Sequence, residues 1–432
     1  MEYHNFDLWV EARTAAGFPL RANSETQGTA KGLMTLDPAS TVVRDYLQKL
    51  EDWETDEAFL RDFGIFLYEA LFTGDIESLF QLSLGEVISQ EERGLRIRLR
   101  IDPPAIAALP WEYTYTPKQK YFLGASRKTP LTRYLEVFQP IRGLKTALPL
   151  KVLVAIPSGS GLDTGKEKGI LTEALGRLGD AVQLRFLEGQ VTRSTVGDAL
   201  LEERYHVFHF IGHGTFEDGQ GYLIFNGEDG DEEDLISDEV FARFFLDEPS
   251  MKLVLLNACE GARVSSSQAM VGMAPRLVER GIPAVIAHQY PVADQAAIRF
   301  AREFYRSLCV GTEAGHVDAA VAHARNQLSI HFSGDRSLGT PVLFMRAPNG
   351  LIFDLPPAPA PAVAPSPGVA KPPLSDEERR HLENLLAVHE RNRRVLEEQV
   401  AAMGAFAPPY MKTQLEDEVA AIKGIREKLG LS

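Results

Sequence analysis

The sequence predicts an α/β protein with a mostly parallel sheet that is covered by helices on both faces. From about residue 150 onward, short continuous apolar runs alternate with segments whose apolar residues recur at helical spacing. A continuous apolar run of strand length indicates a strand buried on both faces, and its alternation with helices indicates a parallel sheet. The predicted strands are 152–156, 182–187, 206–211, 253–256 and 284–287, and the predicted helices are 167–178, 193–203, 238–245, 268–280 and 294–308.

Residues 1–145 carry a different pattern, of mixed helix and strand. Apolar residues at helical spacing predict a helix over 59–72, and strict alternation of apolar residues with arginine predicts a half-buried strand over 95–101. A further strand is expected within 131–138. We therefore expect an N-terminal α+β supporting domain over 1–145, followed by an α/β domain over 146–355.

The C-terminal part is predicted to be a linker followed by a helical hairpin. The linker, 356–374, is rich in proline and alanine, with eight prolines and five alanines in 356–373, which favours stiff polyproline II structure. In 375–432, two amphipathic stretches are separated by Gly404 and a Pro-Pro pair, which predicts two helices. Because two helices bury little surface alone, we expect this hairpin to bind a regulatory or adaptor protein or a second copy of the chain, or to fold back on its own body.

Composition excludes several classes of protein. The 60 acidic residues outnumber the 45 Lys and Arg, for a formal charge of −15, which disfavours binding to nucleic acid or to an anionic membrane. No apolar run is long enough to span a bilayer, and the first residues lack the pattern of a signal peptide. Two cysteines cannot form a disulfide framework. We therefore expect a cytoplasmic protein that binds neither nucleic acid nor membrane.

Two reactive side chains follow two of the predicted strands. Gly212-His213-Gly214 follows one apolar run, and Ala258-Cys259-Glu260 follows another, 46 positions later (259 − 213). Ligands and catalytic groups collect at the carboxyl ends of parallel strands, and adjacent strands lie only about 4.8 Å apart. A lone Cys or His at such a place is usually a packing residue, but the pair together indicates a site.

The chemistry of this pair is that of amide hydrolysis. A thiol needs a base to attack a carbonyl carbon, and an imidazole can take the thiol proton and return it to the leaving amine. The backbone N–H groups of Gly214 and Cys259 could form an oxyanion hole. The sequence therefore predicts a cysteine endopeptidase with His213 as base and Cys259 as nucleophile. The alternative is a non-catalytic scaffold that binds partner proteins.

Four segments resemble the CHAT domain, a branch of the caspase-like cysteine peptidases that also resembles separase. They are His206–Gly214, Leu253–Ala262, Gly281–Asp294 and Gly339–Phe344. The block around Leu95–Ile101 and Pro110–Tyr113 is similar to the region that precedes CHAT domains, where relatives can carry a degenerate caspase-like half. The resemblance implies the dyad named above and a protein substrate. It also implies a place in a bacterial conflict or antiphage defence system, in which the protease is held inactive until a partner triggers it.

Three acidic residues are candidates for binding the substrate. In relatives, the pocket for the residue before the cut draws on two loops, which correspond here to 157–166, with Asp163, and 289–294. Asp294 matches the place where separase-like enzymes carry an acid that receives Arg, so the resemblance implies a preference for a basic or small residue. Asp294 also fits as a helix N-cap, and Asp163 as a solvated turn residue. Glu260 could repel acidic substrates, tune the thiol or face water.

Other patterns carry less chemistry. Residues 217–239 hold ten acids and no Lys or Arg, which fits either electrostatic steering of a basic partner or a solvated hairpin tip, with Asn226-Gly227 as its turn. The stretch 161–166 fails the P-loop pattern because Ser160 and Glu167 stand at required Gly and Ser/Thr positions. We expect no metal, nucleotide or other cofactor.

Overall fold

The computed structural model describes most of the chain. The described residues are 1–136, 144–146, 148–158, 164–187, 190–217, 220–229, 232–258 and 264–355, with positions 386, 389–391, 393–394, 397, 419, 422 and 426 of the C-terminal part. The chain forms two compact units, Met1–Pro359 and Ala360–Ser432. Among the described helices, none combines the length and the apolar character that a bilayer crossing requires.

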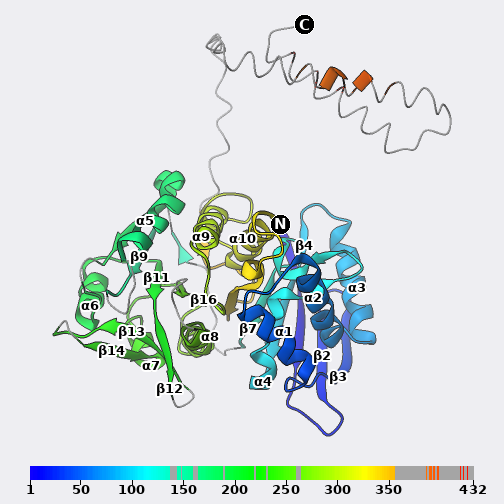
Figure 1. The fold of residues 1–432 in the computed structure, drawn as a ribbon, viewed down its shortest axis with the longest axis horizontal. Coiled ribbons are helices and arrows are strands. Elements are labelled where there is room, and N and C mark those ends of the chain that lie inside the picture. Colours follow the sequence, from blue (N-terminus) through cyan, green and yellow to red (C-terminus); the bar gives the residue numbers. More distant parts are fainter. Residues whose placement is uncertain are drawn as a thin grey trace. The chain divides into compact units, whose positions relative to one another are not determined.

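One large sheet organises the first unit (Figure 1). In spatial order its eleven strands are β10 (Val182–Phe186), β9 (Leu150–Ala155), β11 (Val207–Gly212), β15 (Leu253–Ala258), β16 (Ala284–His288), β17 (Pro341–Met345), β7 (Leu131–Tyr134), β4 (Arg93–Ile101), β1 (Glu2–Val10), β2 (Phe18–Ser24) and β3 (Gly28–Met34). Neighbours pair in parallel except at β16–β17, β1–β2 and β2–β3. The prediction of an α/β fold with a mostly parallel sheet is confirmed.

Helices cover both faces of the predicted α/β part. Along β9, Val152 and Val154 belong to one apolar core, whereas Leu153 and Ala155 belong to another. The first core includes α5 (Thr164–Leu175), α9 (Asp294–Cys309) and α10 (Val317–His331), and the second includes α6 (Arg193–Glu202), α7 (Asp238–Arg243) and α8 (Val264–Glu279). Burial on both sides is the physical reason why this strand is a continuous apolar run.

The N-terminal part extends the same sheet. Its further elements are α1 (Thr41–Glu51), α2 (Glu57–Leu71), α3 (Asp75–Ile88), α4 (Pro104–Ala107), β5 (Tyr115–Thr116) and β6 (Tyr121–Phe122). The remaining strands are β8 (Leu144–Lys145), β18 (Phe353–Asp354) and a small antiparallel sheet of β12 (Gly214–Glu217), β13 (Gln220–Asn226) and β14 (Glu233–Ser237). Because β7 pairs with both β4 and β17, residues on either side of position 146 share one sheet.

Strand β4 departs from the predicted half-buried pattern. Its apolar residues face the core, as expected, but Arg96 on the other face is also buried. The guanidinium of Arg96 forms an ion pair with Asp318 of α10 and donates a hydrogen bond of 2.7 Å to the carbonyl of Asn349. The alternation of Arg with Leu and Ile therefore marks a strand covered on both sides near its middle.

Two further buried arginines connect the N-terminal part to the rest of the unit. Arg325, on α10, donates to the carbonyls of Pro341 at 2.6 Å and Leu131 at 3.3 Å. Burial lowers the pKa of Arg325 to about 10, so the group remains charged near neutral pH. The guanidinium of Arg336 lies 3.6 Å from the ring centre of Trp53. These side chains fix α10 and its following segment against elements far away in sequence.

The second unit is described at only a few positions, and among them residues of both the 386–397 and the 419–426 stretches are helical. Arg426 donates a hydrogen bond of 2.9 Å to the carboxylate of Glu390, which lies 36 positions earlier in the chain. Ile422, one turn before Arg426, is buried. Two helical segments of this unit are thus in contact, and the hairpin over 375–432 remains a prediction for the residues outside the described ones.

The buried pair in β4 yields a stability prediction. Arg96→Met leaves the Asp318 carboxylate buried without its partner, which should lower the free energy of unfolding by about 3–5 kcal/mol. Arg100→Met is the matched control on the same strand, because Arg100 is 36% exposed and its partners Asp102 and Glu136 are 38% and 71% exposed; it should cost about 1 kcal/mol or less. Urea unfolding followed by circular dichroism measures both, and equal losses would contradict a structural role for the Arg96 pair.

Candidate active site

The carboxyl ends of β11 and β15 form the candidate site. These strands pair in parallel, and their last paired residues are Gly212 and Ala258. His213 follows the last residue of β11, and position 259 follows the last residue of β15. Because these two strand ends lie side by side, positions 213 and 259 leave the sheet at the same edge. Three predicted site residues, Cys259, Glu260 and Asp163, lie outside the described residues.

The backbone of His213 is held between two sheets. The carbonyl of His213 accepts a hydrogen bond of 3.0 Å from the N–H of Ile224, and Gly214 pairs with Leu223. His213 is half-buried and Gly214 is buried. Gly212 has no space for a side chain, because an added Cβ would lie 2.8 Å from the Phe210 ring. Small residues on both sides of His213 thus fit a tight exit from the sheet.

Two other histidines lie inside the sheet layer. His209, on β11, and His288, on β16, are both buried. Burial, together with the charge of His288, lowers the pKa of His209 to about 3, and burial lowers the pKa of His288 to about 4. Both imidazoles are therefore neutral near pH 7. His209 belongs to the buried interior, where its Nδ1 lies 3.3 Å from the Tyr305 hydroxyl oxygen.

A small cavity lies among these histidines and Asn257. Its volume of about 10 Å³ is close to the minimum that holds one water molecule. Among the described polar atoms, Oδ1 of Asn257 and Nδ1 of His288 are buried without a hydrogen-bond partner. Asn257 precedes position 259 by two residues, so a buried polar atom lies close to the end of the strand that leads to the predicted nucleophile.

Asp294 lies at the start of α9 but does not cap it. The N-cap is Ala293, and Asp294 belongs to the first helical turn, so the N-cap interpretation is wrong. The Asp294 carboxylate forms an ion pair of 2.5 Å with Nζ of Lys166 on α5. The side chains of Asp294 and Lys166 are 25% and 54% exposed. The Asp294 carboxylate is thus partly accessible, and it pairs with a basic side chain from 157–166, the other loop that was predicted to form the substrate pocket.

The segment before Asp294 is anchored by residues of the N-terminal part. Nε2 of Gln289 donates hydrogen bonds to the carbonyl of Gly339 at 2.6 Å and to Glu112 at 3.2 Å. Glu112 forms a bidentate pair with Arg133 at 2.8 and 2.9 Å. Burial by itself would raise the pKa of Glu112, but the Arg133 guanidinium lowers it below the usual value. The sequence analysis assigned no role to Glu112. The feature that could have indicated its buried ion pair is that it is a charged residue within an apolar stretch.

The loop after β9 is anchored by a residue predicted only as part of a turn. Asn226 is the last residue of β13 and pairs with Glu233, the first residue of β14. Its side-chain oxygen accepts hydrogen bonds from the N–H of Ser158 at 3.1 Å and of Val191 at 2.9 Å, and its amide donates to the Ser158 carbonyl at 2.6 Å. Asn226 thereby positions the start of the loop 157–166.

Several acids of the tract 217–239 have local partners. Asp234 forms a bidentate pair with Arg193 at 2.6 and 2.7 Å, and Glu228 accepts a hydrogen bond from the N–H of Ser194. Asp238 is buried and pairs with Arg280 at 3.2 Å. Asp234 and Glu228 thus attach β14 and the segment before it to α6, and Asp238 attaches α7 to the residue that follows α8. This part of the tract therefore supports the elements around the candidate site.

Comparison with known proteins identifies the family. The CHAT domain profile matches residues 67–333, and no curated protein matches the sequence significantly. Three solved structures are similar in part. The complex of Porphyromonas gingivalis RgpB pro- and mature domains has a TM-score of 0.39 and 14% identity, over 72% of this chain and 78% of that one. The Saccharomyces cerevisiae separase–securin complex has a TM-score of 0.33 and 15% identity, over 72% and 20%.

A secreted C11 cysteine protease from Bacteroides thetaiotaomicron, in complex with an irreversible peptide inhibitor, has a TM-score of 0.28 and 10% identity. The match covers 42% of this chain and 59% of that one. The present chain therefore spans only part of the separase and C11 protease chains. The family profile, in contrast, spans more than half of this chain and includes both strands that lead to positions 213 and 259. The chain belongs to the CHAT domain family.

Proposed function

We propose that this protein is a cysteine endopeptidase that cuts a specific protein partner through His213 and Cys259. The observation that carries the proposal is the register of β11 with β15, in which Gly212 lies opposite Ala258. Residues 213 and 259 directly follow this pair, and adjacent strands lie about 4.8 Å apart. Membership of the CHAT domain family supports a protease in general.

The proposed reaction uses the base and the nucleophile in sequence. The imidazole of His213 accepts the thiol proton of Cys259, and the sulfur attacks the carbonyl carbon of the scissile amide. The N–H groups of Gly214 and Cys259 donate hydrogen bonds to the resulting oxyanion. When the carbon–nitrogen bond breaks, His213 returns the proton to the leaving amine. Water then hydrolyses the acyl-enzyme and restores the thiol.

The proposed substrate preference is for a basic residue before the cut, with small residues also accepted. Asp294 supports this preference because its carboxylate is accessible and pairs with a Lys side chain in the present structure. Asp163 and Glu260 are retained as proposed contacts on sequence grounds alone. A basic substrate side chain would take the place that Lys166 occupies beside Asp294.

The proposed setting is a bacterial defence system in which a partner protein triggers cleavage, with 375–432 as the adaptor segment that recruits a regulator or a second copy. The contact of Glu390 with Arg426 supports a folded unit in this segment. The second candidate function is a non-catalytic scaffold. The reactivity of Cys259 distinguishes the two, because only a protease needs an activated thiol.

Cys259→Ala and His213→Ala should each lower the rate of peptide cleavage by at least about a thousandfold. The nucleophile and the base act as one unit, so removal of either one abolishes the reaction that needs both. The measurement is cleavage of a fluorogenic peptide library, in the presence of the triggering partner where one is required. Cys309→Ala is the control and should retain activity, since Cys309 is buried in the core. Cleavage that persists in either site variant would show that the dyad is wrongly assigned.

Thiol labelling provides an independent test. At pH 7, iodoacetamide should modify Cys259 and spare Cys309, because burial raises the pKa of Cys309 to about 12 and its thiol is therefore protonated near neutral pH. A thiolate formed by transfer of its proton to His213 reacts below the free-thiol pKa of about 8.5. His213→Ala should therefore slow the modification of Cys259, as followed by peptide mass spectrometry. Equal rates with and without His213 would favour the scaffold.

Substrate profiling tests Asp294. Asp294→Ala should reduce the preference for Arg over Ala before the cut by about tenfold, because a partly desolvated charge pair is lost. Lys166→Ala should lower KM for the Arg substrate by about two- to fivefold, as expected for removal of an exposed competing ion pair. Lys168→Ala is the matched control, since Lys168 lies on the same helix over the Phe186 ring. A preference for acidic residues would contradict the proposed pocket.

A further inference from the structure

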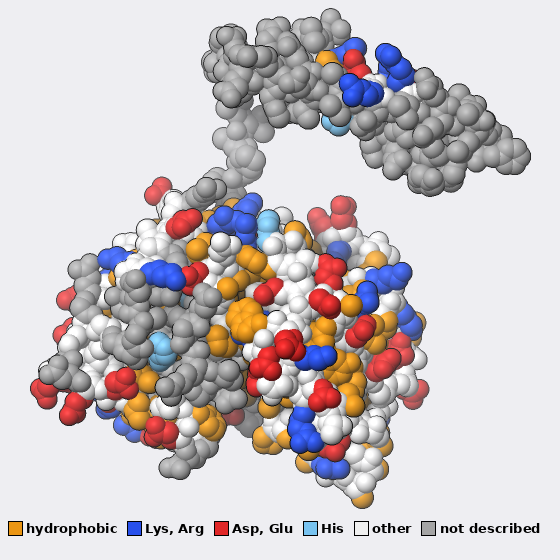
Figure 2. Space-filling model, in the orientation of Figure 1, with side chains coloured by type: hydrophobic (Ala, Val, Ile, Leu, Met, Phe, Trp, Pro, Cys, Tyr) orange, Lys and Arg blue, Asp and Glu red, His pale blue; other side chains and the backbone are white. Residues whose placement is uncertain are grey.

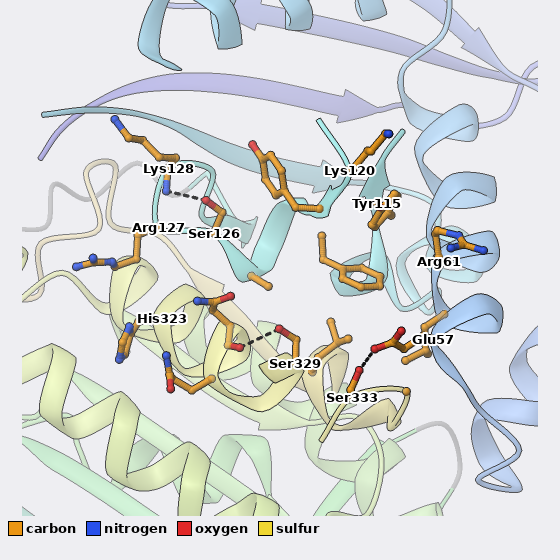
Figure 3. A pocket seen from close by; sticks show the side chains of 18 of the residues that line it. Glu57, Arg61, Tyr115, Lys120, Ser126, Arg127, Lys128, His323, Ser329 and Ser333 are labelled. Carbon is orange, nitrogen blue, oxygen red and sulfur yellow. Dashed lines mark hydrogen bonds between the residues drawn. The ribbon is translucent and has the colours of Figure 1, made fainter. Parts of the chain in front are cut away.

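A large groove lies in the first unit and shares no lining residue with the candidate active site (Figure 3). Its volume is about 890 Å³, which is within the range of ligand sites in proteins. One wall is α2 and the hairpin of β5 with β6, and the opposite wall is α10 and the segment after it. Neither the sequence motifs nor the proposed catalytic chemistry uses this groove.

The charge of the groove is opposite to that of the protein. Four basic side chains and two acidic ones line it, whereas the whole chain holds 45 Lys and Arg against 60 Asp and Glu. The basic residues are Arg61, Lys120, Arg127 and Lys128, and the acidic residues are Glu57 and Glu91. On the face drawn in Figure 2, acidic and basic side chains of the first unit are interspersed. Arg127 pairs with the buried Glu313 carboxylate at 3.0 Å, and Arg61 pairs with Asp62 at 3.6 Å. Because Met1, with its amino group, also lines the groove, a small excess of positive charge remains, and this excess favours an anionic ligand.

The positive charges lie at two ends of the groove. Figure 3 shows Arg127 and Lys128 on one side, and Arg61 and Lys120 on the other. Nζ of Lys128 donates to three backbone carbonyls, those of residues 90, 91 and 93, at 2.6–2.9 Å. Its three N–H donors are thus used within the protein, and Lys128 contributes its charge to the groove rather than a hydrogen bond to a ligand. Lys120 has a φ of 60°, a left-handed conformation that is costly for a residue with a Cβ.

The surface between the two ends offers hydrogen bonds and apolar area. Asn326 and Gln327 line it from α10, and their amides can donate to and accept from a peptide backbone. The rings of Tyr115 and Phe122 also line it and pack edge to face, with centres 5.1 Å apart and planes at 74°. Because the two rings pack against each other edge to face, they do not form two parallel walls between which a nucleobase could stack.

From this arrangement we infer that the groove binds an extended acidic segment of a partner protein. Separated cations match carboxylates spaced along a chain, whereas a phosphate group is best held by donors that converge on one point. The amides of Asn326 and Gln327 would bind the backbone of the segment between its charged side chains. This surface is distinct from 375–432 and does not depend on the catalytic assignment.

The test measures binding of a fluorescein-labelled peptide of alternating Glu and Ser to the full chain by fluorescence anisotropy. The probe should bind at low salt, and added salt should weaken it. The variant Arg61→Glu/Lys120→Glu should bind at least about tenfold more weakly, because two attractions become repulsions. The matched control Arg44→Glu/Lys31→Glu makes the same change of net charge at two exposed positions on α1 and β3, and should bind within about twofold of the original protein.

Three outcomes would overturn the inference. They are no binding of the acidic peptide, equal loss of binding in the groove variant and in the control variant, and equal binding of a Lys-Ser peptide of the same length. ATP serves as a competitor, and ATP binding without peptide binding would assign the groove to a nucleotide instead. Circular dichroism of both variants checks that the fold is intact, and residues 61 and 120 are exposed, so the substitutions leave the core unchanged.

Discussion

The parallel pairing of β11 with β15 is the constraint on which the proposed chemistry depends. It places the end of one strand beside the end of the other, with Gly212 opposite Ala258. Both strands are held in the middle of the sheet by apolar cores on two faces, so their register cannot shift without moving buried side chains to the wrong face. The small sheet of β12, β13 and β14 then fixes the direction in which the chain leaves β11.

Buried arginines bind the N-terminal part to the part that carries the site. Arg325 and Arg336 donate mainly to backbone carbonyls, and Arg96 to a carboxylate and a carbonyl. Such groups add little net stability compared with apolar residues of the same size, but each is costly when one partner is lost. Their geometric demands select one arrangement of α10 against the sheet. Glu112 and Gln289 extend this network to the segment before Asp294.

The strands around the candidate site could be predicted from the sequence because burial on both faces makes them continuously apolar. Since functional groups collect at the carboxyl ends of parallel strands, these strands then pointed to His213. The pairing of β7 with β17 could not be predicted, because it connects residues 211 positions apart (344 − 133). The burial of Arg96 and the ion pair of Asp294 with Lys166 were missed for the same reason, since each partner lies in a distant element. The dyad itself remains a prediction, because Cys259 lies outside the described residues.

Strand β17 has hydrogen-bonded neighbours on both sides, one from each part of the sheet. A gene fragment that encoded only the second part would produce a sheet with an open, apolar edge, which is a template for aggregation. Recombination between genes would therefore have to transfer residues 1–355 together. The described strands of this sheet all lie in the first unit, so an exchange of the sequence after residue 359 would leave every described edge of the sheet as it is.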